Sequence, residues 1–299
     1  MTNTNSTVLA VGAAGKFAGL VVPALAKRGA RVRALVRDAS QTEAVRELGA
    51  SEVAIGDLSD RASLDKALRG VHSVFYIAPA FLPDEAETGR NMVDAAKRAG
   101  ARRFVFSSVI HPILSALENH AAKGPVEEAI LTSGMEYSFL HPTVFFQNYT
   151  QGWPKVVETG VLAEPWSIDS RFSRVDYRDV AEVAAIALTE DRLLSGTFEL
   201  CSEGHLDRKD VAAIIGKVLG RDIKVDRIDP QKAAAGAGDQ AAGLKKMFDW
   251  YDARGLQGCA LTLRAILGRE PRTLLAFFEE LAAGSGEPRS GGHLVGVMK

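Results

Sequence analysis

Five short apolar runs alternate with helical segments in the first third of the chain, and this alternation constrains the fold more than any other feature. The runs cover residues 8–11, 31–37, 52–55, 73–77 and 103–108. Strands that are each followed by a helix become parallel neighbours, because a helical crossover returns the chain to the same edge of the sheet. The sequence therefore predicts an α/β fold with a doubly wound parallel sheet.

The first run leads into a glycine turn of the pattern G-x-x-G-x-x-A, formed by Gly12, Gly15 and Ala18. Gly12 ends the run where the backbone must turn, and the apolar spacing becomes helical from Gly15. Unpaired N–H groups in the first helical turn would bind a pyrophosphate, and Gly15 would let the main chain approach it without a Cβ atom. The pattern predicts a dinucleotide site, and the alternative is a turn with a structural role only.

The end of the second run indicates which dinucleotide binds. An acidic residue at this position binds the ribose 2′-hydroxyl of NAD, whereas an arginine accommodates the 2′-phosphate of NADP. Arg37 holds the position and favours NADP, although Asp38 follows it and leaves the hydroxyl as an alternative partner. A solvated charged pair at the end of a strand is the remaining alternative.

Further candidates stand at the ends of the other strands, where ligands of such sheets gather. We expect Asp57 to meet the adenine, and the small-residue loop that starts at Ala78 to lie near the pyrophosphate and the nicotinamide ribose. The complete set of expected NADP contacts is Gly12, Ala14, Gly15, Lys16, Phe17, Arg37, Asp57, Leu58, Ala78, Pro79, Ser107, Lys123 and Pro142.

The second half of the chain is less regular. It is expected to contain a helix over 119–132, a strand over 137–141, an irregular aromatic region over 149–165 and a mobile alanine- and glycine-rich loop over 233–243. Pro271 is expected as the first residue of a last helix. The predicted organisation is a Rossmann domain over 1–150, a smaller α/β substrate-capping part over 151–283 that is interleaved with it, and a flexible tail over 284–299.

Composition excludes several classes of protein. The 299 residues include 36 basic and 37 acidic side chains, and a net charge of −1 gives no field that would recruit nucleic acid or an anionic membrane. Cys201 and Cys259 have no partner motif, which predicts a reduced protein without a metal site. No signal sequence or membrane-spanning run is evident, so we expect a soluble cytoplasmic monomer or homodimer.

Several motifs occur together and suggest a family. They are the glycine turn, Val-Arg-Ala-Leu-Val-Arg-Asp in the second strand, Gly-Asp-Leu after the third, two serines after the fifth, Lys123 before Val-Glu-Glu, and His-Pro-x-x-Phe-Phe-x-Asn. With them the chain resembles the NmrA-like branch of atypical short-chain dehydrogenases/reductases, up to about Pro230. Relatives in this branch include NADPH-dependent quinone reductases, the isoflavone and pinoresinol reductase group, and regulators that bind NADP without turnover.

The resemblance implies two catalytic candidates, Lys123 and Ser108. His120, one turn from the lysine, is a third candidate, and an incidental histidine is the alternative. The larger superfamily uses a tyrosine four residues before the lysine, but Asn119 stands there in this chain. Lys123 resembles the lysine that the isoflavone reductase group uses near the nicotinamide, although a surface lysine paired with Glu127 is the alternative. His120 is expected to donate a proton near neutral pH.

An aromatic cluster follows the sixth strand and would line a pocket for a planar substrate. The expected substrate contacts are His111, Phe145, Phe146, Asn148 and Trp153, with one of the two phenylalanines in the core. The predicted function is an NADP(H)-dependent oxidoreductase that transfers a hydride between nicotinamide and a small aromatic or conjugated carbonyl compound, such as a quinone or enone. The alternatives are an NADP-binding sensor without turnover and, third, a sugar-nucleotide epimerase.

Overall fold

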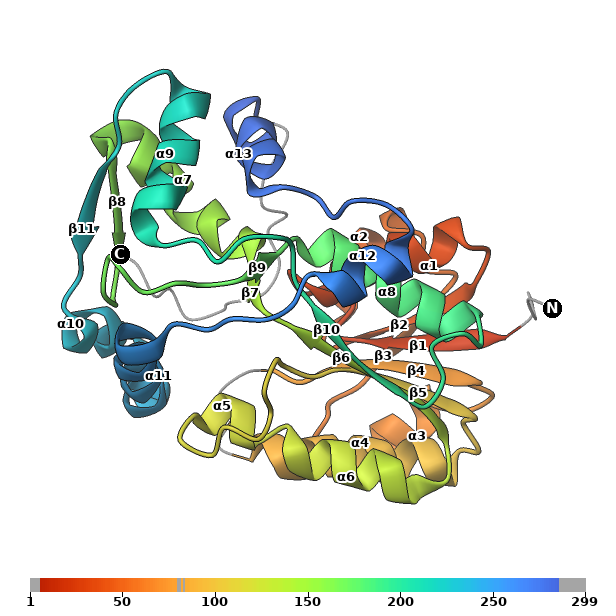
Figure 1. The fold of residues 1–299 in the computed structure, drawn as a ribbon. Coiled ribbons are helices and arrows are strands. Elements are labelled where there is room, and N and C mark those ends of the chain that lie inside the picture. Colours follow the sequence, from red (N-terminus) through yellow and green to blue (C-terminus); the bar gives the residue numbers. More distant parts are fainter. Residues whose placement is uncertain (1–5, 80–81, 83, 285–299) are drawn as a thin grey trace. The chain divides into compact units, whose positions relative to one another are not determined.

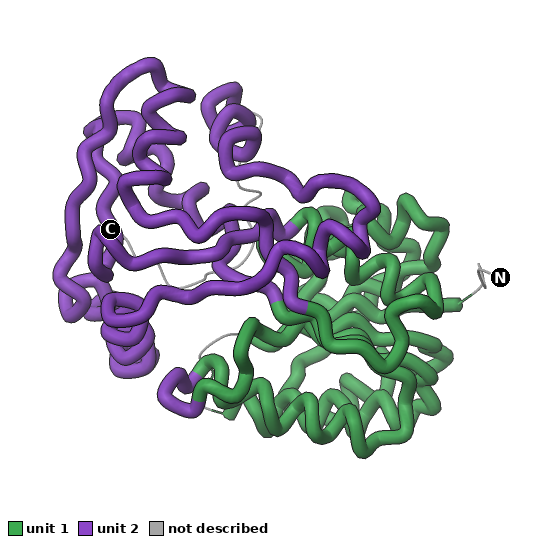
Figure 2. The backbone as a smooth tube through the Cα atoms, in the orientation of Figure 1, with its two compact units in different colours: residues 1–114, 119–141, 178–198 green, residues 115–118, 142–177, 199–299 purple. Residues whose placement is uncertain are grey.

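The structure, a computed structural model, describes residues 6–79, 82 and 84–284 (Figure 1). The chain forms two compact units (Figure 2). Unit 1 consists of residues 1–114, 119–141 and 178–198, and unit 2 of residues 115–118, 142–177 and 199–299. Residues 178–198, which the sequence assigned to the smaller part, therefore belong to unit 1. Most of the expected tail, from residue 285 on, lies outside the described residues.

A seven-stranded sheet of the order β10-β6-β5-β4-β1-β2-β3 organises unit 1. Neighbouring strands are parallel from β6 to β3, which confirms the predicted doubly wound parallel sheet. The chain order reverses direction between β1 and β4, and ligands of such sheets bind in the crevice at that point. The strands are β1 (Thr7–Val11), β2 (Arg31–Val36), β3 (Glu52–Ile55), β4 (Ser73–Ile77), β5 (Arg103–Ser107), β6 (Glu136–Pro142) and β10 (Gly196–Leu200).

Helices cover both faces of this sheet. In Figure 1, α3 (Arg61–Ala67), α4 (Glu85–Arg98) and α6 (Gly124–Ser133) lie on one face. The other face carries α1 (Ala18–Lys27), α2 (Thr42–Glu47) and α8 (Tyr177–Thr189). The short elements η1 (Ala39–Gln41) and α5 (Glu118–Ala121) complete the helical segments of this part of the chain.

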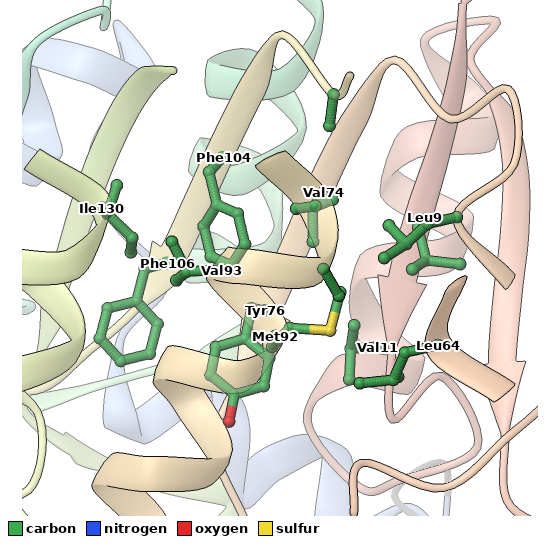
Figure 3. Packing of buried hydrophobic residues seen from close by; sticks show 14 of the residues in the cluster. Leu9, Val11, Leu64, Val74, Tyr76, Met92, Val93, Phe104, Phe106 and Ile130 are labelled. Atoms are coloured by element: carbon green, nitrogen blue, oxygen red, sulfur yellow. The ribbon is translucent and has the colours of Figure 1, made fainter. Parts of the chain in front are cut away.

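The core between the sheet and the first helical layer follows from the two-residue period of the strands, since alternate side chains point to the same face. Tyr76, Phe104 and Phe106 point into this layer, where they contact apolar residues of α4 and α6 such as Met92 and Ile130 (Figure 3). Tyr76 stacks on Phe106 with ring centroids 5.6 Å apart. The packing holds α4 and α6 against the sheet and thereby fixes the positions of their first turns.

Unit 2 contains two parallel strand pairs and a set of helices. β8 (Val161–Glu164) pairs with β11 (Lys224–Arg227), and β7 (Val144–Phe145) pairs with β9 (Arg174–Val175). Its apolar core includes Phe146, Trp153, Phe277 and Phe278. The helical elements are η2 (Phe146–Asn148), α7 (Tyr149–Thr159), α9 (Arg208–Leu219), α10 (Pro230–Ala234), η3 (Ala235–Gln240), α11 (Ala241–Arg254), α12 (Leu261–Leu267) and α13 (Leu274–Ala282).

Four expectations about secondary structure were wrong. The helix expected over 119–132 is interrupted, so that Lys123 is the N-cap of α6. The irregular region over 149–165 contains α7, which tolerates Pro154 in its interior, and β8. The loop over 233–243 is mostly helical, because its alanines favour helix, and the backbone departs from helical φ/ψ at Gly238. Finally, the last helix starts after Thr273, whose hydroxyl accepts a hydrogen bond from the Ala276 N–H, and not at Pro271.

Among the described residues, no helix is long and apolar enough to span a bilayer. Within the same ranges, no three histidine, cysteine, aspartate or glutamate side chains are grouped as metal ligands.

Candidate functional site

The glycine turn after β1 has the geometry of an anion-binding loop. Gly12 has a φ of +68°, a conformation that favours glycine, and the Gly15 N–H donates to the Gly12 carbonyl over 2.8 Å. A Cβ atom on Gly15 would lie 3.0 Å from that carbonyl oxygen. α1 begins at Ala18, three residues later than expected, and the side chain of its N-cap residue Phe17 makes no capping hydrogen bond. The Gly19 and Leu20 N–H groups donate to the Gly15 and Phe17 carbonyl oxygens, and no side chain caps the start of α1, where a phosphate binds in folds of this kind.

Lys16 adds a positive charge to this turn. The residue as a whole is exposed, yet the chain around its ammonium desolvates that group and lowers the pKa of Lys16. The ammonium lies 5.5 Å from the centroid of the Phe17 ring. Lys16 is thus placed beside the main-chain groups of Gly15, where a diphosphate would be attracted. Ala14, between the glycines, is half-buried.

Arg37 follows β2 and is exposed, and its guanidinium makes no hydrogen bond or ion pair with any other residue in the described ranges. Asp38 is used differently, because its carboxylate accepts the Ser40 N–H over 2.7 Å and forms a capping box with Gln41 at η1. These hydrogen bonds hold the pKa of Asp38 below its ordinary value. The Asp38 carboxylate thus caps η1, whereas the Arg37 guanidinium is available to bind an anion.

The ends of β3 and β4 carry the next expected contacts. The Asp57 carboxylate accepts hydrogen bonds from the Ser59 N–H and hydroxyl at 2.8 and 2.6 Å. These bonds and the nearby charge of Arg37 lower the pKa of Asp57. Leu58 is half-buried against the core, Ala78 is buried and Pro79 is half-buried. Arg37 and Asp57 are thus electrostatic neighbours at the end of the sheet where the adenosine is expected.

Lys123 is buried and forms an ion pair with Glu85. The two residues are 6% and 3% exposed, and they come from the N-cap of α6 and the first residue of α4. An ammonium has three donors, and Glu85 is the single side-chain acceptor that Lys123 has among the described residues. The alternative of a surface lysine paired with Glu127 is therefore wrong.

His120 is neutral near pH 7 in this structure, and its expected role as a proton donor stays a prediction. It is completely buried, and desolvation lowers the pKa of His120 to about 4, so the imidazole is neutral near pH 7. Its Nδ1 lies 3.2 Å from the His111 carbonyl oxygen, while its Nε2 has no partner in the described part of the chain. If Nδ1 carries the proton, Nε2 is a buried acceptor rather than an acid.

Ser108 donates a hydrogen bond of 2.5 Å to the Glu127 carboxylate, which lies 2.8 Å from Nε2 of His141. Glu127 lies in the first turn of α6, where the helix dipole stabilises a carboxylate. This bond uses the Ser108 hydroxyl proton, so Ser108 in this arrangement is an acceptor for any further ligand. Ser107 before it is fully buried at the end of β5.

The expected substrate residues divide between core and surface. Phe146 and Trp153 are buried in unit 2, and Trp153 stacks on Phe278 with ring centroids 5.4 Å apart. The expected pocket role of Trp153 stays a prediction. Phe145 is half-buried with an edge-to-face contact to Tyr177, and Asn148 is exposed. Pro142, an expected cofactor contact, is buried at the end of β6 in unit 2. His111, in unit 1, has a φ of +53°, a strained conformation for a residue other than glycine.

The sequence analysis did not predict the pairing of Lys123 with Glu85 or of Ser108 with Glu127, nor the contact of Glu127 with His141. An acidic residue in the first turn of a helix is a common capping feature, so the sequence held no signal that Glu85 would be buried against Lys123.

The residues of unit 1 fit a dinucleotide. A Cβ atom on Gly15 would lie only 3.0 Å from a carbonyl oxygen, and neither the Arg37 guanidinium nor Nε2 of His120 has a hydrogen-bond partner among the described residues. A polar ligand would relieve the cost of leaving such an atom unsatisfied. The fold and these groups define a Rossmann-type dinucleotide-binding unit.

Comparison with known families agrees with this class. The model of the NmrA-like family matches residues 4–277, and the chain belongs to that family. NAD(P)H azoreductase of Xenophilus azovorans is 30% identical over 288 residues, which cover 93% of this chain and 99% of that protein. Quinone oxidoreductase 2 of Escherichia coli is 26% identical over 271 residues, with 88% of this chain and 94% of that protein covered.

Solved structures support the fold. The NADPH complex of the Escherichia coli quinone oxidoreductase has a TM-score of 0.80 at 24% identity, with 92% of this chain and 99% of that chain covered. The NADP(H) complex of the Citrobacter triphenylmethane reductase has a TM-score of 0.81 at 22% identity, with 93% and 100% covered.

Proposed function

We propose that this protein is an NADPH-dependent reductase that transfers a hydride to a small aromatic or conjugated carbonyl compound of the quinone or enone type. The family and the relatives matched over nearly their whole lengths support the coarser assignment, an NAD(P)H-dependent oxidoreductase. The azoreductase and the quinone oxidoreductase among these relatives favour a flat conjugated acceptor. The preference for NADPH rests on one observation, the guanidinium of Arg37 after β2, which has no hydrogen-bond or ion-pair partner among the residues that the structure describes.

In this proposal the residues of unit 1 bind the cofactor from its adenosine to its nicotinamide end. Arg37 binds the 2′-phosphate through charge-assisted hydrogen bonds. The N–H groups of the turn around Gly15 and the start of α1 bind the diphosphate, with Lys16 beside them. Bound NADPH supplies the hydride.

Lys123 acts at the nicotinamide end. Two of its three N–H donors have no acceptor among the described residues, so they are available to a ribose hydroxyl or to the developing oxyanion of the substrate. Neutral His120 offers Nε2 as an acceptor, and Ser108 accepts rather than donates. The proton that accompanies the hydride therefore comes from Lys123 or from water. Phe145, Asn148 and His111 are the proposed substrate contacts.

The test is to mix the protein with NADPH and a panel of quinones, enones and azo compounds and to follow the nicotinamide absorbance. Sustained oxidation above the background supports the reductase. Tight NADPH binding without oxidation across the panel would instead support the sensor without turnover, which the absent tyrosine at position 119 favours. The proposal further includes a monomeric or homodimeric state and no affinity for nucleic acid, which the same preparation can test, and a cytoplasmic location.

A further inference from the structure

We infer that Glu85 is a positioning residue that holds the Lys123 ammonium in the orientation in which it meets the cofactor and the substrate. The inference rests on the proposed function and extends it to a residue in the first turn of α4. Glu85 acts through Lys123 and touches neither NADPH nor substrate in this proposal.

The burial of the pair supports a functional role. Both side chains are almost completely removed from solvent, and the ion pair joins two helices of unit 1. Desolvating a carboxylate and an ammonium costs several kcal/mol each, and such a pair is often no more stable than apolar residues of the same volume. Stability alone therefore gives little reason for this pair to lie here.

The packing of the two helices does not require the pair. A Cβ atom on Gly89 of α4 would lie 2.4 Å from Cγ2 of Val126 on α6, so the helices already approach closely through apolar contact one turn away. Ile130 and Met92 extend the same apolar contact in the core cluster. The ion pair is thus an addition to an interface that is apolar elsewhere.

The surroundings of the pair determine where the ammonium points. The Tyr76 hydroxyl is buried without a partner in the described ranges, and burial together with the Glu85 charge raises the pKa of Tyr76. Tyr76 therefore stays a neutral phenol and does not compete with Glu85 as an anion. Lys123 is left with one carboxylate that fixes one donor, and its other two donors face no described acceptor.

The experiment is a double-mutant cycle with Glu85→Gln, Lys123→Met and the double variant. Each single variant breaks the buried ion pair, so each should be less stable than wild type, whereas the double variant should recover most of the loss. The kinetic readouts are kcat and KM for menadione and the Kd for NADPH from calorimetric titration. For Glu85→Gln we expect kcat to fall at least about tenfold and the NADPH Kd to rise about fivefold, with KM for menadione within about twofold of wild type.

The double variant distinguishes positioning from a structural role. It should be as stable as wild type but keep the low kcat and weak NADPH binding of Lys123→Met, because the ammonium is gone. Glu85→Asp, which keeps the charge on a shorter side chain, should recover part of kcat and serves if Glu85→Gln does not fold. Glu87→Gln is the matched control, since Glu87 lies in the same helical turn and is exposed.

Two results would overturn the inference while leaving the proposed function intact. One is a Glu85→Gln variant with wild-type kcat and NADPH affinity, and the other is a stable double variant with wild-type kcat. A wild-type protein that oxidises no NADPH with any acceptor would overturn the proposed function, and the positioning role with it.

Discussion

Gly89 of α4 and Val126 of α6 lie so close that a Cβ atom on the glycine would be 2.4 Å from Cγ2 of the valine. The helices that carry Glu85 and Lys123 are therefore in contact at a position where only glycine fits. The closeness of these two residues fixes the distance between the first turns of the helices, and with it the candidate site.

We expect Gly89→Ala to destabilise the protein by about 1–3 kcal/mol, because the added methyl group overpacks a buried interface. Chemical denaturation monitored by circular dichroism measures the change. Val126→Ala in the Gly89→Ala background should restore part of the loss. Gly152→Ala is the control, since a Cβ atom there meets nothing within 4 Å, and it should leave stability equal or slightly higher.

Gly15→Ala should weaken NADPH binding at least about tenfold, since a Cβ atom 3.0 Å from the Gly12 carbonyl oxygen reshapes the turn and occupies the approach to the diphosphate. Calorimetric titration gives the Kd, and a thermal melt checks the fold. If the variant binds NADPH as tightly as wild type, the turn does not hold the diphosphate.

Arg37→Ala should reduce the preference for NADPH over NADH by about tenfold or more, because the 2′-phosphate loses a charge-assisted hydrogen bond. Stability should change by less than about 0.5 kcal/mol, since the guanidinium has no partner among the described residues. Arg46→Ala, at an exposed site on α2, is the control. An unchanged NADPH preference would show that Arg37 does not bind the 2′-phosphate.

The stability of the protein should fall as the pH drops from about 6.5 to 4, in part because of His120. The pKa of this residue is about 4 in the folded protein and near the ordinary value of 6.5 in the unfolded chain, so the unfolded state binds more protons in this window. The contribution present above pH 6.5 is about 3 kcal/mol and is lost as the pH falls through 4.

His120→Asn keeps a donor for the His111 carbonyl but does not titrate, so its stability should depend less steeply on pH than that of wild type. Melting temperatures measured between about pH 7 and 4.5 report the difference. His205→Asn, which changes an exposed histidine, should keep the wild-type slope. Equal slopes for His120→Asn and wild type would mean that His120 is not buried as a neutral group.

Trp153→Ala should lose about 3–5 kcal/mol of stability, as expected for a buried aromatic side chain stacked on Phe278. Phe145→Ala should instead raise KM for aromatic acceptors with a smaller loss of stability, because Phe145 is only half-buried. Denaturation curves and steady-state kinetics on both variants separate the two effects. A Trp153→Ala variant with wild-type stability and a raised KM for aromatic acceptors would show that Trp153 lines the substrate pocket.

The sequence predicted the parallel sheet because its signals are local. The apolar residues Val8, Leu9 and Val11 predict a buried strand before Gly12. The alternation of such strands with helices continues up to Ser107. Helix α9 carries local signals of the same kind, since Asp207 caps its start and Gly220 ends it. Where an element was missed, as in α7, Gly152 and Pro154 lowered the helical signal and tertiary packing of Trp153 supplied the stability.

The candidate site was predictable only where main-chain geometry makes it. Gly12 and Gly15 follow from a spacing rule, but the partners of Lys123, His120 and Ser108 depend on contacts between residues far apart in the chain. Burial lowers the pKa of His120 and keeps its imidazole neutral near pH 7, and the sequence around His120 does not indicate that burial.

Because unit 1 consists of three separate segments of the chain, its composition affects where the chain can be truncated and when the unit can fold during synthesis. Residues 178–198 supply α8, and the Arg103 guanidinium donates to the Ala187 and Glu190 carbonyl groups near the end of that helix. A gene fragment that stops near residue 150 would remove these two acceptors and leave the Arg103 guanidinium with Glu136. On the ribosome, the nucleotide-binding half stays incomplete until residue 198 has emerged, after residues 142–177 of the other unit have already left the exit tunnel.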